Sequence, residues 1–537
     1  MKQRRLQSAI SALFVLAIAL PLLAVGALGL GALRDASALT WMAQTVLPVY
    51  LINSIMLCLG SLFVALLLAM PASWFLSQYE FRGRAVLEWA MILPMALPAY
   101  VVAYAYTDAL DYSGWLAVML RDLGPIIGLD NNAFRVIWPE IRSLPGAAFV
   151  LGVALSPYVG LLAKAAFEDR QVNLSEAARS LGLSPIQAFY RVVIPLARPA
   201  LVAGGALVIM ECVADYGTVS FFSVQTLSTG LFKTWFGYGD RQAAALMGFG
   251  MLGLAIAILA WERLARGRAG FTGRPGQARP RLPLQGRARF WVPLVCGLGG
   301  TFGFLVPLLL LLRAAIASGA PVDLSRLTGQ ALQTGLYGLY ALAVILPIAI
   351  VLAYGQRSRQ PGLLSRALQF ASSGYAVPGL VVAVGLLGWS AVFTQTAMAF
   401  FDWRITLTAT SLLLIGGYLT RFFTVGYSTV EVGLGRLTPS LDWSARSLGL
   451  TPSQVIWRVH WPILRGSAAV AGLLVFVDVV KELPLTLVLR PMNVETLATA
   501  AHQFAADERL AEAAWPSLAI AAVGLLPVLL LGPRLRR

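Results

Sequence analysis

Long apolar stretches dominate this chain and leave few folds open to it. A helix that crosses the hydrocarbon core of a bilayer needs about 20 apolar residues. By that measure the sequence predicts about twelve membrane-spanning helices, near residues 8–33, 46–75, 85–107, 144–166, 199–224, 243–262, 291–316, 333–354, 368–394, 405–428, 467–490 and 514–532. We therefore expect an all-α membrane protein that is surrounded by membrane lipid.

The composition excludes a soluble globular domain. Hydrophobic residues make up 58% of the 537 and charged residues only 12%, whereas roughly a quarter of the residues in a soluble domain are charged. The three cysteines lie far apart within apolar sequence, so neither a disulfide framework nor a zinc site is predicted. A signal peptide is the alternative for the first apolar run, but the run is long and no small-residue cleavage site follows it.

Basic residues collect in alternate loops between these predicted helices. They gather at the N-terminus, in 76–88, 170–198, 263–290, 355–366 and 435–465, and in the C-terminal tail. Because cytoplasmic loops carry the excess of Lys and Arg, both termini are expected on the cytoplasmic side. The net charge of +16 has the same cause, so no nucleic-acid partner is inferred.

One polar segment occurs twice. SEAARSLGLSPIQAFYRVVIP at 175–195 aligns with DWSARSLGLTPSQVIWRVHWP at 442–462, with an offset of 267 residues. We therefore expect two homologous modules, 1–262 and 291–537, joined by a basic cytoplasmic linker, 263–290. The Arg, Gly and Pro content of the linker is typical of a flexible tether, although such a segment could also bind RNA or anionic lipid.

Each polar segment lies in a predicted cytoplasmic loop, at 170–198 or 435–465. Helix-compatible small residues are followed by Ser184-Pro185 or Thr451-Pro452, which offers an N-cap with proline at the first helical position. This pattern predicts a short helix, a turn and a second short helix. The small residues at 177, 178 and 182 leave a helix face that fits a groove in another protein. A generic amphipathic connector is the alternative, which two copies at equivalent positions disfavour.

The first loop resembles the EAA loop of ABC importer permeases, through Glu176-Ala177-Ala178, Gly182 and Val192-Val193-Ile194-Pro195. In that family this loop forms coupling helices that seat in the ATPase subunits, and two permease modules form one translocation path. The resemblance implies two type I importer modules fused in one chain, in the bacterial cell inner membrane. It implies as partners two copies of an ABC ATPase subunit, which bind the ATP, and a periplasmic substrate-binding protein.

The resemblance also implies roles for particular residues. The positions expected to couple to the ATPase are Glu176, Ala177, Ala178, Gly182, Pro195, Asp442, Ala445, Gly449 and Pro462. The second copy departs from the family pattern, because Trp443-Ser444-Ala445 stands where Glu-Ala-Ala is expected, with Asp442 adjacent. This departure puts symmetric coupling to the two ATPase copies in doubt.

No catalytic motif accompanies the predicted spans. The sequence lacks G-x-x-x-x-G-K-[ST], and its histidines, His460 and His502, have no evident nucleophile beside them. We therefore expect no enzyme activity and no bound cofactor in this chain, with ATP hydrolysis in a separate subunit. A secondary transporter and a scaffold or receptor subunit are the alternative classes.

Four acidic residues follow the two loops within predicted spans. The offset of 267 pairs Glu211 with Asp478 and Asp215 with Glu482. The spacing of four residues puts each pair on one helix face, and an ionisable group at bilayer depth costs roughly 2.5–3.5 kcal/mol. We expect these carboxylates to line the translocation path as an acidic patch for a hard cation. Pairing with Lys481 or Arg490, to fix packing or a gate, is the alternative, and no metal site is firmly assigned.

The stretches that follow the acidic pairs carry a second resemblance. Residues 213–240 and 476–514 resemble the fused permeases for iron(III), which implies iron(III) as the cargo. Fused permeases for thiamine and for aminoethylphosphonate share the architecture, so these substrates stay open. Residues 216–218 and 483–485 also predict a helix break. The long outer loop 108–143 is interpreted either as a docking site for the binding protein or as a structural lid.

Overall fold

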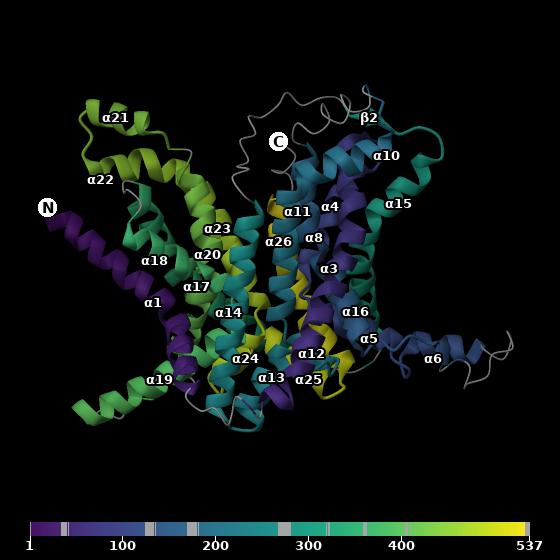
Figure 1. Ribbon diagram of the computed structural model, residues 1–537, viewed down its shortest axis with the longest axis horizontal. Helices are drawn as coiled ribbons and strands as arrows, with labels where there is room; N and C mark the ends of the chain where they lie inside the picture. The colour runs from purple at the N-terminus through teal and green to yellow at the C-terminus, as the bar shows by residue number, and fades with distance from the viewer. Residues whose placement is uncertain are drawn as a thin grey trace. The chain divides into compact units, whose positions relative to one another are not determined.

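Figure 1 shows the computed structural model, which is almost entirely helical. It describes residues 2–33, 40, 42–123, 134, 136–168, 180, 182–266, 281–317, 319, 323–357, 362–402, 406–408, 410–435 and 437–531. Within a bilayer every backbone N–H and C=O must be paired internally, and a helix achieves this within one segment. The all-α prediction is confirmed.

Ten helices of the described chain are long and apolar enough to cross a membrane, or eleven if one bent pair counts as a span. The bent pair joins Arg84–Ala96 to Ala99–Leu123 at 94°, so the span predicted at 85–107 is not straight. Pro98 caps the second helix, and Leu97 before it is extended, as a residue before proline prefers to be. A further helix, α20 (Ser411–Leu434), lies near the predicted span 405–428 but is not among the ten.

The chain forms two compact units that are not contiguous in sequence. Unit 1 comprises Met1–Leu39, Leu231–Gly253 and Ser325–Thr499. Unit 2 comprises Thr40–Gly230, Leu254–Leu324 and Ala500–Arg537. Four helices begin in one unit and end in the other: α13 (Leu227–Phe232), α14 (Arg241–Arg266), α25 (Leu497–Ala506) and, by its first residue alone, α17 (Leu324–Arg357). Each unit therefore draws its end helices from both halves of the sequence.

Unit 2 is built around α3, α8 and α11, which pack against one another (Figure 1). Close packing requires small residues here, because a Cβ at Gly152 of α8 would lie 2.5 Å from the Cβ of Val64 on α3. The elements of this unit are α3 (Leu47–Gln78), β1 (Tyr79–Glu80), α4 (Arg84–Ile92), η1 (Leu93–Ala96), α5 (Ala99–Leu110), α6 (Trp115–Leu123), α8 (Leu144–Glu168), α10 (Pro185–Ala188), η3 (Phe189–Val193), α11 (Ile194–Ala214), α12 (Gly217–Phe221), most of α13 (Leu227–Phe232), β2 (Leu282–Pro283), α15 (Ala288–Gly300), η5 (Thr301–Leu305), α16 (Val306–Ala317) and α26 (Leu510–Leu531).

Unit 1 is built around α17, α20 and α23. A Cβ at Gly426 of α20 would lie 3.3 Å from the Ile345 side chain of α17 and 3.4 Å from the Val475 side chain of α23. Besides α20, the elements of this unit are α1 (Lys2–Ala32), η4 (Lys233–Gly237), α17 (Leu324–Arg357), α18 (Leu363–Ala371), η6 (Ser372–Ala376), α19 (Gly379–Phe401), α21 (Pro439–Ser447), α22 (Pro452–Val455), η7 (Ile456–His460), α23 (Trp461–Lys481) and α24 (Pro484–Leu489).

The internal repeat is visible in the helix boundaries. An offset of 267 carries α10, η3 and α11 onto α22, η7 and α23, residue for residue at both ends. An offset of 280 carries the start of α5 at Ala99 onto the start of α19 at Gly379. We call the two aligned parts of the chain the first and second repeat. In both repeats a π-helical turn precedes a proline, Pro195 or Pro462, whose ring would otherwise clash with the carbonyl four residues earlier.

The leading helix of each repeat packs with elements of the other repeat. In unit 1, α1 packs along α19, and a Cβ at Gly385 would lie 2.2 Å from the carbonyl oxygen of Pro21. The hydroxyl of Thr420 on α20 also donates to the carbonyl of Ile18 at 3.0 Å. In unit 2, α15 packs against α3 and α4, and α16 packs against α5. Both compact units are therefore composites of the two repeats.

Part of the predicted linker has regular structure. Residues 267–280 lie outside the described residues, but Leu282–Pro283 pairs in parallel with Tyr79–Glu80. Arg281, just before this strand, lies 3.2 Å from the carboxylate of Glu168 at the end of α8. Leu284 is buried against Leu76 and Val292. The C-terminal end of the linker is thus attached to unit 2, close to the end of α8.

Candidate functional site

The second polar loop forms the predicted short helix, turn and short helix. Helix α21 (Pro439–Ser447) ends before Gly449, whose φ of +81° is a conformation that favours glycine, and α22 begins at Pro452. Thr451 accepts a hydrogen bond from the backbone N–H of Gln454 at 3.4 Å, and the Gln454 side chain accepts from the N–H of Thr451 at 2.9 Å. This reciprocal capping fixes the start of α22.

The described part of the first loop has the same geometry. Gly182 has a φ of +94°, and Ser184 and Gln187 exchange hydrogen bonds of 3.2 and 3.0 Å. Glu176, Ala177 and Ala178 lie outside the described residues. The sequence reading predicted the Ser and Thr caps but missed their glutamine partners, although Gln three residues after a Ser or Thr N-cap is a recognised sequence signal.

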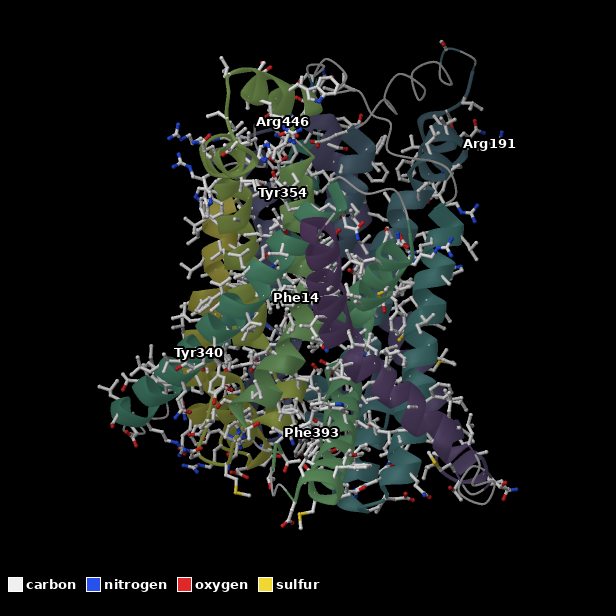
Figure 2. All side chains as sticks on the ribbon, turned by 90° about the vertical axis from the view of Figure 1, so that its left-hand side faces the viewer. Phe14, Arg191, Tyr340, Tyr354, Phe393 and Arg446 are labelled. Atoms are coloured by element: carbon white, nitrogen blue, oxygen red, sulfur yellow. The ribbon has the colours of Figure 1, made fainter. Side chains whose placement is uncertain are left out.

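A buried histidine connects the second loop to the transmembrane helices. His460, at the end of η7, is 2% exposed. One ring nitrogen, Nε2, lies 2.5 Å from the carboxylate of Asp442 on α21, and the other, Nδ1, is hydrogen-bonded to the hydroxyl of Tyr354 on α17. We call Tyr354, Asp442 and His460 the histidine clasp. Figure 2 shows Tyr354 at the same end of unit 1 as Arg446, which α21 carries.

The first repeat has an apolar cluster at the equivalent place. The offsets of 267 and 280 put Val193 at the position of His460 and Trp74 at the position of Tyr354. Val193 is fully buried, and the Trp74 ring packs edge-on against Phe167 and Phe189, at centroid distances of 5.4 and 5.0 Å. A histidine without a nucleophile beside it in the sequence gives no sign of this clasp, because Asp442 and Tyr354 lie 18 and 106 residues away in the chain.

The predicted helix break after the acidic pairs is confirmed in both repeats. Helix α11 ends at Ala214 and α23 ends at Lys481, and the next residues, Asp215 and Glu482, have extended backbones. The Asp215 carboxylate accepts hydrogen bonds from the backbone N–H groups of Thr218 and Val219, each at 3.1 Å, and so caps α12. The Glu482 carboxylate likewise accepts from the N–H of Leu485 at 3.1 Å.

The two break residues have different charge partners. Glu482, 6% exposed, forms an ion pair with Arg421 of α20 at 3.1 Å, and a Cβ at Gly379 would lie less than 3 Å from both side chains. At the position of Arg421 the first repeat has Ala154. The sequence reading named Lys481 and Arg490 as partners, whereas a lone arginine within the predicted span 405–428 was the signal for Arg421.

The remaining acidic residues lie one turn earlier on the same helices. Glu211 and Asp215 belong to unit 2, and Asp478 and Glu482 belong to unit 1. The four-carboxylate patch therefore stays a prediction. Among the residues that the structure describes, no group of three or more His, Cys, Asp or Glu side chains is arranged to hold a metal ion.

Arginine–carboxylate contacts fasten the ends opposite the coupling loops. In unit 2, Arg142 lies 3.1 Å from Asp111 and 2.6 Å from Glu508. In unit 1, Arg326 lies 2.8 Å from Glu495. Hydrogen bonds from these arginines hold the pKa values of Glu508 and Glu495 below the ordinary glutamate range. The segment 108–143 thus contributes structural ion pairs, and its role as a docking site for the binding protein stays a prediction.

Comparisons with known proteins identify the family to which the chain is similar. Residues 61–264 match the model for the binding-protein-dependent transport system inner membrane component. The chain is 32% identical to a molybdenum ABC transporter permease of Haloferax volcanii over 39% of this chain and 76% of that protein. It is 32% identical to a sulfate transport system permease of Nephroselmis olivacea over 28% of this chain and 49% of that protein.

One relative aligns with nearly the whole chain. The Fe(3+)-transport system permease protein FbpB 2 of Haemophilus influenzae is 25% identical over 504 residues, which are 89% of this chain and 88% of that protein. The family is the membrane component of its transport systems, is not itself catalytic, and implies an ATPase and a binding protein as partners. This chain belongs to the family of binding-protein-dependent transport system inner membrane components and is a multi-pass permease of an ABC importer.

Proposed function

We propose that this chain is the permease of an ABC importer for iron(III), which a periplasmic binding protein delivers. The observation that carries the proposal is the alignment with the iron(III) permease FbpB 2, which extends over 89% of this chain. The sulfate and molybdenum permeases align with 28% and 39% of it. Of these three relatives, only the iron(III) permease has a counterpart for both repeats.

The charges at the helix breaks support a cationic cargo. Asp215 is partly exposed, and among the residues that the structure describes it accepts hydrogen bonds from Thr218 and Val219 of its own short helix, whereas Glu482 pairs with Arg421. A carboxylate at a break in a membrane helix attracts cations and repels anions such as sulfate. A role for Glu211, Asp215, Asp478 and Glu482 along the translocation path is part of this proposal.

In this proposal ATP drives the cycle through the two polar loops. Two ATPase copies close on ATP, and the coupling helices in 170–198 and 435–465 transmit that closure to the transmembrane helices. Gly182 and Gly449 set the turn in each loop, and Ala445 is a buried residue of α21. The modules 1–262 and 291–537 then rock between inward-open and outward-open states, in the bacterial inner membrane, with both termini in the cytoplasm.

Uptake of several labelled substrates tests this function. Liposomes that contain the chain, its ATPase and its binding protein are given ATP and radiolabelled iron(III), thiamine, aminoethylphosphonate or sulfate in parallel. We expect ATP-dependent uptake of iron(III) alone. Uptake of thiamine or aminoethylphosphonate without iron(III) would keep the permease and replace its cargo. Uptake that persists without the ATPase subunit would instead indicate a secondary transporter.

A further inference from the structure

An exposed aromatic and basic surface lies where the chain enters α23. Trp457 and Trp461 are 67% and 39% exposed, and their rings meet edge-on with centroids 6.0 Å apart. Arg465 follows Trp461 by four residues and so lies on the same helix face. Arg458 is next to Trp457 in the chain, and both arginines are exposed. We call Trp457, Arg458, Trp461 and Arg465 the Trp457 surface.

The arginines of this surface are available to an external group. Neither Arg458 nor Arg465 has an ion pair or a hydrogen bond within the part of the chain that the structure describes. Arg142, Arg326 and Arg421, by contrast, each pair with a carboxylate. A guanidinium forms two parallel hydrogen bonds with a phosphate as it does with a carboxylate. The Trp457 surface is therefore suited to an anion that lies outside this chain.

The span that begins here places the surface at the edge of the bilayer. Ile456–Lys481 is able to cross a membrane, and its 26 residues extend about 39 Å at 1.5 Å per residue. The hydrocarbon core is about 30 Å thick, so part of this helix lies in a headgroup layer. Figure 1 shows α22 lying crosswise to α23, and η7 joins them. A helix crosswise to a span runs along the membrane surface, so the residues of η7 lie at headgroup level.

The first repeat has the same exposed side chains, although its buried residues differ. The offset of 267 puts Tyr190, Arg191 and Arg198 at the positions of one tryptophan and the two arginines. All three are exposed. The buried position between them holds Val193 in the first repeat and His460 in the second. This pattern is expected where the exposed sides meet the same surroundings in both repeats and the buried sides meet different neighbours.

We propose that the Trp457 surface binds anionic phospholipid in the leaflet on the side of the coupling loops. Arg458 contacts phosphate at the bend, and Arg465 reaches the same layer by extending its side chain toward it. The tryptophan rings lie between headgroups and acyl chains, where tryptophan is enriched. His460 of the histidine clasp directly precedes Trp461. Bound lipid therefore holds the base of the second coupling loop in place.

The ATPase is the other partner near this loop. Its contact is expected at α21, where Trp443 is 71% exposed, and at the turn that follows, where Leu448 is 82% exposed. The Trp457 surface belongs to the membrane span instead. Ile463, 42% exposed, continues it along α23 with an apolar side chain that suits acyl chains. Charge and position thus favour phospholipid at this surface.

Photocrosslinking in nanodiscs tests the surface directly. The complete importer, with its ATPase and binding protein, is placed in phosphatidylcholine that contains a minor fraction of photoactivatable phosphatidylglycerol, and crosslinked peptides are identified by mass spectrometry. In the wild type we expect crosslinks within 456–465 to exceed those from photoactivatable phosphatidylcholine by about 10-fold. Arg458→Gln/Arg465→Gln should remove this excess.

Three controls separate the site from general effects on the protein. Arg458→Lys/Arg465→Lys keeps the charge and should retain most of the excess. Arg241→Gln removes an exposed arginine at the start of α14, outside the Trp457 surface, and should crosslink like the wild type. Crosslinks within 189–198 of the first repeat should persist in every variant, which shows that the protein is folded. Equal crosslinking by the two lipids at 456–465 would overturn the site. Crosslinks that appear there only when the ATPase is omitted would assign the surface to that subunit.

ATP hydrolysis measures the consequence for coupling, whatever the cargo is. In liposomes we expect the binding protein to stimulate hydrolysis several-fold more with phosphatidylglycerol present than in phosphatidylcholine alone, for the wild type and Arg241→Gln. The difference should be smaller in Arg458→Gln/Arg465→Gln. An equal dependence on phosphatidylglycerol in this variant and in the wild type would refute the role of the bound lipid at the coupling loop.

Discussion

The bases of the two coupling loops have the same backbone and different chemistry. In the first repeat Trp74, Phe167, Phe189 and Val193 pack as an apolar cluster. In the second repeat the histidine clasp occupies the equivalent place. The helix boundaries of the two loops nevertheless agree residue for residue from α10 and α22 onward. Helix geometry is therefore set by features that both loops share, such as the capping boxes, the positive-φ glycines and the prolines.

The same contrast recurs at the helix breaks. Both breaks are capped by a carboxylate, but Glu482 also pairs with Arg421, whereas the Asp215 carboxylate accepts hydrogen bonds from Thr218 and Val219 of its own short helix. Two identical subunits must carry the same side chains at both sites, whereas two repeats in one chain can diverge. The difference teaches that the two repeats keep a common helix geometry, while their side-chain chemistry differs from one repeat to the other.

Removing Arg421 gives the largest expected effect. Arg421→Met leaves the buried carboxylate of Glu482 without its cation, which costs about 3–5 kcal/mol of unfolding free energy. Thermal unfolding of the purified protein in detergent measures this loss. The double variant Arg421→Met/Glu482→Leu should recover most of the stability, because the orphaned charge is gone. If Arg421→Met is as stable as the wild type, the ion pair of Glu482 does not distinguish the two breaks energetically.

Replacing His460 by valine, the residue at the equivalent position of the first repeat, gives an intermediate loss of stability. His460→Val removes the hydrogen bonds that hold α21 to η7 and α17, at a cost of about 1–3 kcal/mol for the buried groups left unpaired. We expect the number of substrate molecules transported per ATP hydrolysed to fall, while the protein still inserts and binds its ATPase. His460→Gln, which keeps a donor and an acceptor, should restore part of the coupling. Unchanged coupling in His460→Val would show that an apolar side chain supports coupling as well as the histidine clasp does.

Removing the ion pair between Arg326 and Glu495 in unit 1 gives the smallest loss of stability, and this loss depends on pH. Because Arg326 lowers the pKa of Glu495, the pair contributes stability above the ordinary glutamate pKa of 4.5 and loses it as pH falls through the lower folded-state value. We expect Glu495→Gln to cost about 0.2–1 kcal/mol at neutral pH, as for other partly exposed pairs. Unfolding curves of the variant and the wild type should converge below pH 4.5. A gap that persists in acid would assign the effect to the hydrogen bond that the Gln330 side chain donates to the Glu495 side chain.

The sequence predicted the helical class, the repeat and the helix breaks, because these depend on local features. Apolar length, Gly182 and Gly449, and the residue before Pro98 each act on their own segment. The histidine clasp and the Arg421–Glu482 pair join residues 18 to 106 positions apart in the chain. No periodicity in one sequence specifies such partners. A charged residue in a predicted span indicates that an ion pair is needed. Its partner is determined by the packing of α20 against α23, which the sequence alone does not specify.

The packing of the leading helix of each repeat against the other repeat has a consequence for biosynthesis. Helix α1 is the first to leave the ribosome, but its packing partner α19 begins 347 residues after α1 ends. Translation at roughly 5–20 residues per second separates their appearance by about 20–70 s. During that time the surface of α1 that packs on α19, including the carbonyl of Pro21, lacks its partner, although α14, which also contacts α1, is made earlier. Neither compact unit can be completed until the second half of the chain has been synthesised, so the two repeats mature together.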